Sequence, residues 1–290
     1  MNIIYELDLQ KVTTIGIKSK AVGLIEVDTI EHLHQTFDYI HNEDVQAMLL
    51  GNGSNIIPSK EFITYYLIKI KKRNEFHAKM AHEKVYVTAR GGDSLKRFVM
   101  WCADKGLKGV ECLAGIPGTI GGAVKMNAGS FGGEIGDFVK EISVWHETQG
   151  LLNFKKEEID FSYRNISLPL EKGHWCIWEV IFEFSRQDPK IVKSRIRENY
   201  MKKKNTQPVL EKSCGCVFKN PGGYAAGYLL EKAGLKRKRI GDMEFSHLHA
   251  NFLINRGKGT PAQAMELIEI GKKKVFDKFG INLELEVKII

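Results

Sequence analysis

The chain has 290 residues, of which 43% are hydrophobic, so it can bury a large core and is long enough for two or three domains. Its formal net charge is +8 at pH 7. It lacks the apolar run of roughly eighteen residues that a membrane-spanning helix needs. Because Glu6 and Asp8 lie where a signal peptide would be basic and then apolar, we expect a soluble, cytoplasmic protein.

The cysteines argue against both a disulfide framework and a zinc site. They are odd in number, sparse for a chain of this length and never spaced as C-x-x-C. We therefore expect no structural disulfide and no metal. The cysteines are Cys102, Cys112, Cys176, Cys214 and Cys216.

The positive charge is concentrated in four short runs. Such runs are usually solvated surface, but they also suit phosphate-bearing small molecules or a nucleic-acid backbone. No helix-turn-helix, zinc-finger or aromatic RNA-binding motif accompanies them, so nucleic acid is the weaker alternative. The runs are residues 71–73, 202–204, 236–239 and 272–274.

The first predicted elements are a strand over residues 22–27, a helix over 29–41 with Asp28 as its N-cap, and a strand over 47–50. The second strand runs directly into the turn Gly51-Asn52-Gly53-Ser54-Asn55. A turn of this kind can direct backbone N–H groups at a phosphate. It lacks the third glycine of the dinucleotide fingerprint and the Gly-Lys-Ser/Thr of a P-loop, so taken alone it is a weak signal.

A strand over residues 84–89 and a helix over 93–105, with Asp93 as N-cap and Gly106 as its stop, come next. The following segment, residues 115–133, is rich in glycine, and apolar side chains are interleaved with the glycines. Glycine removes the side chain that keeps a ligand from the backbone, so this segment predicts a site for a large anionic group such as a pyrophosphate.

Strands are then predicted over residues 139–146 and 175–184, which are rich in β-branched and aromatic residues. Between them lies Tyr163-Arg164, which in isolation reads as a surface pair. A basic helix is predicted over residues 189–204.

A domain boundary is predicted near residue 207, because a proline follows and the composition changes. Beyond it we predict helices over residues 223–233 and 260–280, and a final strand over 281–289. The strict alternation of that strand places aliphatic side chains on one face and polar ones on the other.

Six ordered motifs together resemble the UDP-N-acetylenolpyruvoylglucosamine reductase family, flavoenzymes of bacterial peptidoglycan precursor synthesis, over essentially the whole chain. The motifs are the Gly51–Asn55 turn, Gly-Ile-Pro-Gly-Thr-Ile-Gly-Gly-Ala with Met-Asn-Ala-Gly from residue 115 to 129, Tyr-Arg-x-x-Ser from 163, Ser-Cys-Gly-x-Val-Phe-Lys-Asn-Pro from 213, Ala-Gly-Leu-Lys from 233, and Leu-x-x-Glu-Val-x-Ile-Ile from 283.

The resemblance implies an α+β protein with an FAD-binding fold of the vanillyl-alcohol-oxidase (p-cresol methylhydroxylase) type. Two α/β subdomains would clasp FAD, and a C-terminal α+β domain would cover the substrate. The implied boundaries are 1–73 for the first subdomain, joined by the strand 283–290, 74–207 for the second, and 208–282 for the substrate domain. The short spacing between Tyr163-Arg164 and the Ser-Cys-Gly motif resembles the type II branch, which lacks a substrate-closing tyrosine loop.

In this family NADPH reduces a non-covalent FAD, and hydride then passes from flavin N5 to the enol ether of UDP-N-acetylglucosamine enolpyruvate. A side chain protonates the adjacent carbon of the resulting enolate, which gives UDP-N-acetylmuramate. Motif matching assigns the catalytic roles to Arg164 and Glu286, which would stabilise the enolate, and to Cys216, which would donate the proton. The family usually has serine in place of Cys216, so the thiol marks a departure from the pattern.

The resemblance also implies the binding residues. Substrate would be bound by Tyr163, Lys219, Asn220 and Lys236. FAD would be bound by Gly51, Asn52, Gly53, Ser54, Asn55, Gly115, Ile116, Pro117, Gly118, Thr119, Gly121, Gly122, Asn127, Ala128 and Gly129.

Further departures lie in Thr13–Ser19, which lacks the family's double glycine, and at Asn52, which replaces a frequent glycine. Two other functions stay open at this point: a different oxidoreductase on the same flavin scaffold, and a non-enzymatic polyanion-binding protein. We expect a monomer with a small-molecule substrate and neither nucleic acid nor membrane as partner.

Overall fold

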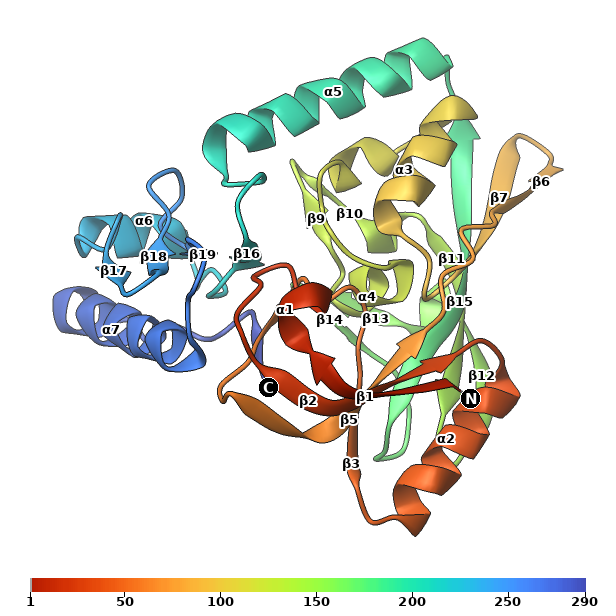
Figure 1. Ribbon diagram of the computed structural model, residues 1–290. Helices are drawn as coiled ribbons and strands as arrows, with labels where there is room; N and C mark the ends of the chain where they lie inside the picture. The colour runs from red at the N-terminus through yellow and green to blue at the C-terminus, as the bar shows by residue number, and fades with distance from the viewer. Residues whose placement is uncertain (1) are drawn as a thin grey trace. The chain divides into compact units, whose positions relative to one another are not determined.

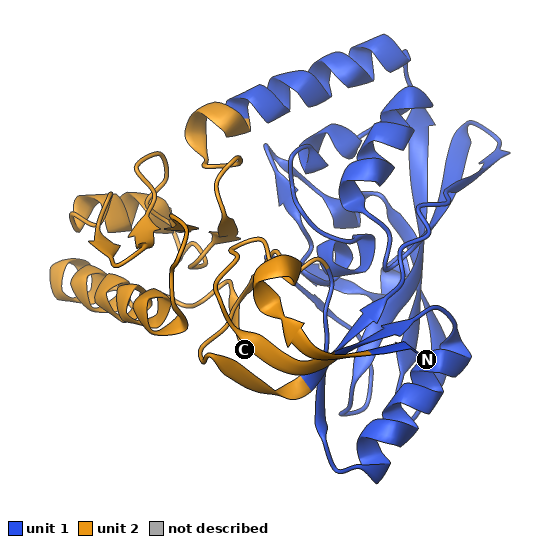
Figure 2. Ribbon diagram, viewed as in Figure 1, with its two compact units in different colours: residues 1–3, 24–51, 66–202 blue, residues 4–23, 52–65, 203–290 orange. Residues whose placement is uncertain are grey.

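The computed structural model describes residues 2–290 (Figure 1). The chain forms two compact units, which Figure 2 shows in different colours. Unit 1 consists of the start of the chain, Leu24–Gly51 and Tyr66–Lys202. Unit 2 consists of Ile4–Gly23, Asn52–Tyr65 and Lys203–Ile290.

The described residues form the following elements. The α-helices are α1 (Leu9–Val12), α2 (Ile30–Asn42), α3 (Leu95–Asp104), α4 (Ile120–Lys125), α5 (Pro189–Thr206), α6 (Ala226–Lys232) and α7 (Pro261–Phe279). The 3₁₀ helices are η1 (Val110–Leu113), η2 (Ile135–Asp137) and η3 (Lys156–Glu158). The strands are β1 (Asn2–Asp8), β2 (Lys20–Val27), β3 (Gln46–Leu49), β4 (Ile56–Ile57), β5 (Phe62–Ile70), β6 (His77–Ala81), β7 (Lys84–Arg90), β8 (Leu107–Lys108), β9 (Gly129–Ser130), β10 (Gly133–Glu134), β11 (Val139–His146), β12 (Gly150–Lys155), β13 (Asp160–Ser162), β14 (Asn165–Ser167), β15 (Trp175–Arg186), β16 (Ser213–Cys216), β17 (Arg239–Ile240), β18 (Met243–Phe245), β19 (Phe252–Asn255) and β20 (Lys288–Ile289).

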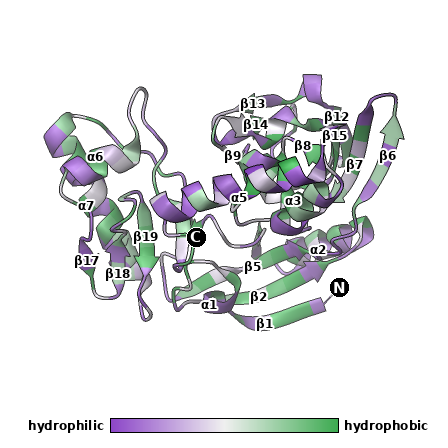
Figure 3. Cartoon of the chain, turned by 90° about the horizontal axis from the view of Figure 1, so that it is seen from above, coloured by the Kyte–Doolittle hydropathy of each residue, from purple (hydrophilic) through white to green (hydrophobic). Residues whose placement is uncertain are grey.

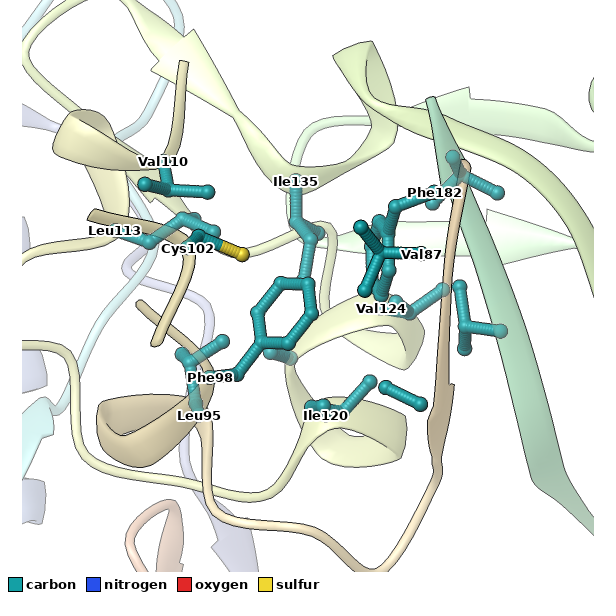
Figure 4. Packing of buried hydrophobic residues seen from close by; sticks show 14 of the residues in the cluster. Val87, Leu95, Phe98, Cys102, Val110, Leu113, Ile120, Val124, Ile135 and Phe182 are labelled. Atoms are coloured by element: carbon teal, nitrogen blue, oxygen red, sulfur yellow. The ribbon is translucent and has the colours of Figure 1, made fainter. Parts of the chain in front are cut away.

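Unit 1 is organised around an antiparallel sheet with the strand order β12-β11-β15-β7-β6, to which β8 adds at β15. The long strand β15 pairs with both β11 and β7, so it holds the centre of the sheet. Helix α4 packs against β15, and its buried Val124 joins the same core as Phe98 of α3 and Phe182 of β15. Figure 4 shows Phe98 surrounded by the other labelled side chains of this core. A separate four-stranded sheet has the order β1-β2-β5-β3.

Unit 2 contains an antiparallel sheet of order β16-β19-β18-β17, and α7 packs on β17 and β18. Its core includes the fully buried Phe218 and Phe245. Helix α7 begins as the sequence predicts, because Thr260 caps it by accepting a hydrogen bond from the Gln263 N–H, and it ends at Gly280 in the left-handed conformation. The predicted helix over 223–233 is shorter, as α6, and also ends before a glycine.

Helix α2 is capped by Thr29, whose hydroxyl accepts from the His32 N–H, so the prediction that Asp28 is its N-cap is wrong. Asp28 instead accepts hydrogen bonds from the guanidinium groups of Arg73 and Arg90, each at 3.1 Å. These hydrogen bonds, that of Arg73 foremost, lower the pKa of the Asp28 carboxyl. Two charge-assisted hydrogen bonds to arginines stabilise the Asp28 carboxylate more than capping the nearby helix α2 would.

The predicted N-cap of α3 is wrong in the same way, because Ser94 caps this helix by accepting from the Arg97 N–H. Asp93 is fully buried and accepts hydrogen bonds from the backbone N–H groups of Arg73, Asn74 and Arg90, at 2.9, 2.7 and 3.1 Å. One carboxylate therefore joins the chain after β5 to the end of β7.

Replacing Asp93 by alanine should lower the free energy of unfolding by about 3 kcal/mol, because three backbone N–H groups lose the buried carboxylate that accepts their hydrogen bonds. The matched change Ser94→Ala removes only a helix cap and should cost about 1 kcal/mol. Urea titration of the three proteins measures both values. Equal losses for the two variants would show that the Asp93 hydrogen bonds carry no special weight.

The predicted strand over residues 281–289 is wrong for most of its length, since only β20 is strand and pairs in parallel with β4. The alternation of burial survives nevertheless, with Leu283 and Val287 buried and Glu284 exposed. The segment is irregular because its backbone forms hydrogen bonds with the short stretch 217–219 instead of with a strand. The Glu286 N–H donates to the Val217 oxygen, and the Glu284 oxygen accepts from the N–H of Lys219. The periodicity therefore predicted which side chains are buried, but it did not predict that the segment lacks the backbone pairing of a regular strand.

The basic helix α5 is confirmed and ends before Pro208, and Figure 3 shows it as largely hydrophilic. The division into three domains with a boundary at 207 stays a prediction. Among residues 2–290 no helix is long and apolar enough to cross a membrane. The same residues contain no cluster of side chains able to hold a metal ion, and none of the cysteines forms a disulfide.

Candidate functional site

Within unit 1, the turn after β3 and the start of α4 meet at two of the predicted residues. A Cβ atom on Gly51 would lie 2.9 Å from the hydroxyl oxygen of Thr119. That hydroxyl also accepts a hydrogen bond from the Gly122 N–H at 3.2 Å, which caps α4. The two glycine segments that the sequence singled out are therefore packed together, and only glycine at position 51 leaves room for the contact.

In unit 2, a later residue of the same turn, Gly53, is held by the N-terminal segment. It has a φ of +63°, and a Cβ atom there would lie 2.2 Å from the carbonyl oxygen of Val12. Its own carbonyl oxygen accepts a hydrogen bond from the Thr14 N–H at 3.0 Å. Gly53 is therefore fixed by both conformation and space. The segment that begins at Thr13 supports the turn even though it lacks the family's double glycine.

The end of this turn contacts the C-terminus of the chain, also within unit 2. The side-chain nitrogen of Asn55 donates to the Glu286 carbonyl oxygen at 3.1 Å, and the Lys288 N–H donates to the Asn55 oxygen at 2.9 Å. Asn52, Ser54 and Asn55 are half-buried. A predicted cofactor residue thus positions the backbone of a predicted catalytic residue.

The rest of the second glycine segment follows the core of unit 1. Ile116 packs against that core, and the Gly118 oxygen accepts from the Leu95 N–H at 3.2 Å. The Gly121 N–H donates to Gly91 at 2.8 Å, and the Ala128 oxygen accepts from Ile135 at 2.9 Å. Gly129 lies in β9, and Gly115 and Pro117 are exposed.

Asn127 connects this segment to the predicted catalytic arginine. Its side chain donates to the Ser162 oxygen and accepts from the Gly136 N–H, both at 3.2 Å. Ser162 pairs with Asn165 across the β13–β14 hairpin, whose two-residue turn is Tyr163-Arg164. The buried Asn127 therefore holds the hairpin and need not touch a cofactor to be important.

Tyr163 and Arg164 lie at the tip of that hairpin. Arg164 has a φ of +59° and is half-buried, whereas Tyr163 is 51% exposed. The guanidinium of Arg164 lies 5.2 Å from the centre of the Tyr163 ring, within range of a cation–π contact. A hairpin turn with φ above zero thus presents a cation and an aromatic hydroxyl together.

In unit 2, Cys216 and Glu286 are connected through the backbone of the residue that follows Cys216. The Glu286 N–H donates to the Val217 oxygen at 2.8 Å, and Phe218 forms a bridge with Leu285. Cys216 is half-buried. The sequence predicted both residues as catalytic from motifs about seventy positions apart, and the structure brings their backbones together.

The neighbouring Cys214 has a different environment. It is buried, and burial raises the pKa of its thiol to about 12, with smaller contributions from the charges of Cys216 and Glu286. A thiol in such surroundings stays protonated and unreactive. Of the two cysteines of the Ser-Cys-Gly-Cys motif, Cys216 is therefore the one suited to chemistry.

Apart from Tyr163, which belongs to unit 1, the predicted substrate residues lie in unit 2, and each of these has a protein partner. Lys219 forms an ion pair with Glu284 at 3.4 Å, and Lys236 forms one with Glu231 at 3.0 Å. The side-chain oxygen of Asn220 accepts from the Ala226 N–H at 2.9 Å, at the start of α6. Both lysines are partly exposed, so their ammonium groups remain accessible to an anionic ligand.

Sequence reasoning missed two buried asparagines of unit 2. Asn251 holds the motif that begins at Ser213, because its side chain accepts from the Phe218 N–H at 2.9 Å and donates to the Phe218 oxygen at 2.8 Å. Asn255 donates to the carbonyl oxygens of Ile15 and Gly16. The sequence did contain a signal for them, because both asparagines lie in the otherwise apolar stretch at 250–255.

Known proteins resemble the chain along its whole length. Residues 21–152 match a family model described as an FAD binding domain, and residues 207–290 match one described as UDP-N-acetylenolpyruvoylglucosamine reductase, C-terminal domain. The UDP-N-acetylenolpyruvoylglucosamine reductase of Aquifex aeolicus is 37% identical, with 100% of this chain and 96% of that protein covered. The reductase of Geobacillus kaustophilus is 34% identical, with 100% and 93% covered.

A solved structure agrees with these matches. The crystal structure of UDP-N-acetylenolpyruvylglucosamine reductase from Thermus caldophilus has a TM-score of 0.82 at 30% identity, and the match covers 100% of this chain and 99% of that one. The expected α+β flavin-binding fold is confirmed. The chain belongs to the UDP-N-acetylenolpyruvoylglucosamine reductase family.

Proposed function

We propose that this FAD-dependent oxidoreductase uses NADPH to reduce UDP-N-acetylglucosamine enolpyruvate to UDP-N-acetylmuramate, a step of peptidoglycan precursor synthesis. The observation that carries the proposal is the arrangement in unit 2, where Glu286 bonds to the residue after Cys216 and to Asn55 of the glycine turn. The segments that carry the Cys216 thiol and the Glu286 carboxyl group, and the turn proposed to bind phosphate, therefore belong to one hydrogen-bonded framework.

The residues present fit FAD. Gly51 has no room for a side chain beside Thr119, and Gly53 has a left-handed backbone against Val12, so both positions of the turn require glycine. Backbone N–H groups of such turns suit a pyrophosphate. The turn Gly51–Asn55 and the segment Gly115–Gly129 would hold the cofactor, and the bound flavin, once reduced by NADPH, would supply the hydride.

The side chains would act on the charge and the proton. Hydride addition to the enol ether leaves an enolate conjugated with a carboxylate, and fixed cations or donors are needed to stabilise it. Arg164 would supply positive charge, and Glu286 would donate a hydrogen bond in its protonated form. The thiol of Cys216 would give its proton to the carbon next to the one that received hydride. Tyr163, Lys219, Asn220 and Lys236 would bind the sugar and diphosphate of the substrate.

Mass spectrometry of the product tests this reaction. Incubation of the FAD-loaded protein with NADPH and UDP-N-acetylglucosamine enolpyruvate should yield a product heavier than the substrate by two hydrogen atoms. Omission of NADPH should leave the substrate unchanged. A substrate that stays unchanged while NADPH is consumed would indicate a different flavin oxidoreductase.

Hydrogen peroxide should inactivate the enzyme through Cys216. Peroxide oxidises a thiol to a sulfenic acid and is itself reduced to water, and the half-buried Cys216 is more accessible than the buried Cys214. We expect activity to fall with peroxide dose in the natural protein and to persist in Cys216→Ser. Equal loss in both proteins would place the sensitive group elsewhere.

We further propose that the protein is a cytoplasmic monomer built of the three domains 1–73 with 283–290, 74–207 and 208–282. The nucleotide nature of the proposed cofactor and substrate supports the cytoplasmic location. The parallel pairing of β20 with β4 supports joining the C-terminal strand to the first domain, and the C-terminal family model, which matches from residue 207 onward, supports the last boundary. Size-exclusion chromatography with light scattering measures the oligomeric state.

A further inference from the structure

Unit 1 contains a cavity of about 670 Å³ that is lined by the last residues of the glycine-rich segment, Phe131–Gly133, but by none of the individual residues proposed for FAD, catalysis or substrate. Its walls come from η1, the turn between β9 and β10, the start of β11, the end of β15 and helix α5. A volume of this size is typical of sites for small organic ligands. The proposed function therefore leaves the cavity unexplained.

The charge lining this cavity is positive on balance. Five cationic side chains line it, against three carboxylates. Two of these carboxylates already have partners: Glu183 pairs with Lys84 at 3.3 Å, and Asp137 accepts from the Glu134 N–H at 3.0 Å. Lys108 and Lys140 are exposed, and Lys140 interacts electrostatically with Glu183. The excess of cationic over acidic side chains at one cavity favours an anionic ligand.

An aromatic surface faces the same cavity. The ring of Phe138 has two neighbours: it stacks on Phe184 with the ring centres 5.6 Å apart, and its Cε1 atom lies against Gly109. A Cβ atom on Gly109 would lie 2.2 Å from this ring, so the ring can lie where it does only because residue 109 has no side chain. Phe131, at the tip of the β9–β10 turn, is 49% exposed. Phe131 and Phe138 offer a stacking surface for a flat ligand.

A buried carboxylate completes the lining. The side chain of Glu111 is only 10% exposed. One of its oxygens accepts from the Gly109 N–H, whereas the other has no hydrogen-bond partner among the described residues. Its cationic neighbour, Arg195 of α5, lies 3.9 Å from that oxygen, beyond hydrogen-bond distance. An acceptor left unsatisfied in a buried place is costly, so the oxygen suits a ligand that brings an N–H donor.

We propose that this cavity binds a nucleoside phosphate at a site separate from the active site. The phosphate lies at Lys108 and Lys140, the base stacks on Phe131 and Phe138, and an N–H group of the base donates to Glu111 after a small movement of Arg195. These three features differ in chemistry and line one cavity, which distinguishes the site from a merely basic surface. Nucleoside phosphates are present in the cell together with the proposed nucleotide-sugar substrate.

Isothermal titration calorimetry with FAD-loaded protein and saturating UDP-N-acetylglucosamine enolpyruvate tests the proposal. Occupying the active site first ensures that a failure of the cavity to bind nucleotide and a failure of the proposed reaction are distinguishable. GMP, AMP, UMP and inorganic pyrophosphate serve as separate probes. We expect one nucleotide per chain, bound more tightly than pyrophosphate because the base adds stacking and a hydrogen bond.

The double variant Lys108→Glu with Lys140→Glu should weaken nucleotide binding by at least about tenfold. The matched control carries Lys96→Glu and Lys273→Glu, two exposed lysines that do not line the cavity, and should bind as the natural protein does. Phe131→Ala should weaken the nucleotides but not pyrophosphate. No binding at millimolar nucleotide, equal loss in the control, or pyrophosphate binding as tightly as the nucleotides would overturn the proposal.

Discussion

Replacing Cys216 by alanine is expected to lower turnover by about 100-fold to 10,000-fold, the range over which a positioned general acid contributes. Alanine cannot donate a proton, so the enolate formed after hydride transfer has no partner at the adjacent carbon. Reduction of FAD by NADPH does not need this proton and should keep its rate. Stopped-flow absorbance of the two half-reactions separates them, because the defect should appear only in reoxidation of the flavin by the enolpyruvyl substrate.

The matched control is Cys216→Ser, which restores the residue that the family usually carries at this position. It should retain turnover, since a hydroxyl can also deliver the proton. Cys214 is unsuited as the donor, because burial raises the pKa of its thiol to about 12. An alanine variant with unchanged flavin reoxidation would show that another group protonates the product.

Replacing Gly53 by alanine should abolish FAD binding. The alanine Cβ would lie 2.2 Å from the Val12 carbonyl oxygen, a contact that real Cβ atoms do not show, and the φ of +63° adds roughly 1 kcal/mol of strain. Because the neighbour is backbone, the turn itself has to move. We expect the purified variant to lack the flavin absorbance of the natural protein and to regain little of it when FAD is added.

Gly132→Ala provides the control for backbone strain alone. Gly132 has a φ of +83°, but no atom lies within 4 Å of the place that a Cβ atom would occupy, so alanine there meets strain without a clash. This variant should keep its FAD and lose only a small amount of stability. Full flavin content in both variants would contradict the role assigned to the Gly51–Asn55 turn.

The sequence predicted the kind and order of the longer helices and of several long strands because apolar periodicity survives folding, but it missed strands such as β1, β5 and β12. The strands at β2, β7, β11 and β15 and the helices α5 and α7 lie within a few residues of their predicted bounds. The two helix caps were each placed one residue early. Asp28 and Asp93 are good caps in isolation, but Arg73 and the backbone after β5 give both carboxylates stronger partners that sequence alone does not show.

Site residues could be predicted only where a motif names them. Gly51, Cys216 and Glu286 were predicted through the resemblance, whereas the contacts that position them were not. Asn251 reaches Phe218 across 33 positions, and Asn55 reaches Glu286 across 231. Such hydrogen bonds depend on tertiary packing and leave no local pattern. The C-terminal segment shows the converse case, since its alternation predicted burial while its backbone bonds to Val217 prevent a regular strand.

The most direct test of the proposed function is an anaerobic absorbance titration of the purified protein. We expect flavin bands at about 370 and 450 nm, as the family resemblance implies, that bleach on addition of NADPH. They should return in full when one equivalent of UDP-N-acetylglucosamine enolpyruvate is added, because the substrate takes up the hydride. Bleaching without return would contradict the proposed substrate, and a protein that cannot be loaded with FAD would contradict the flavin chemistry itself.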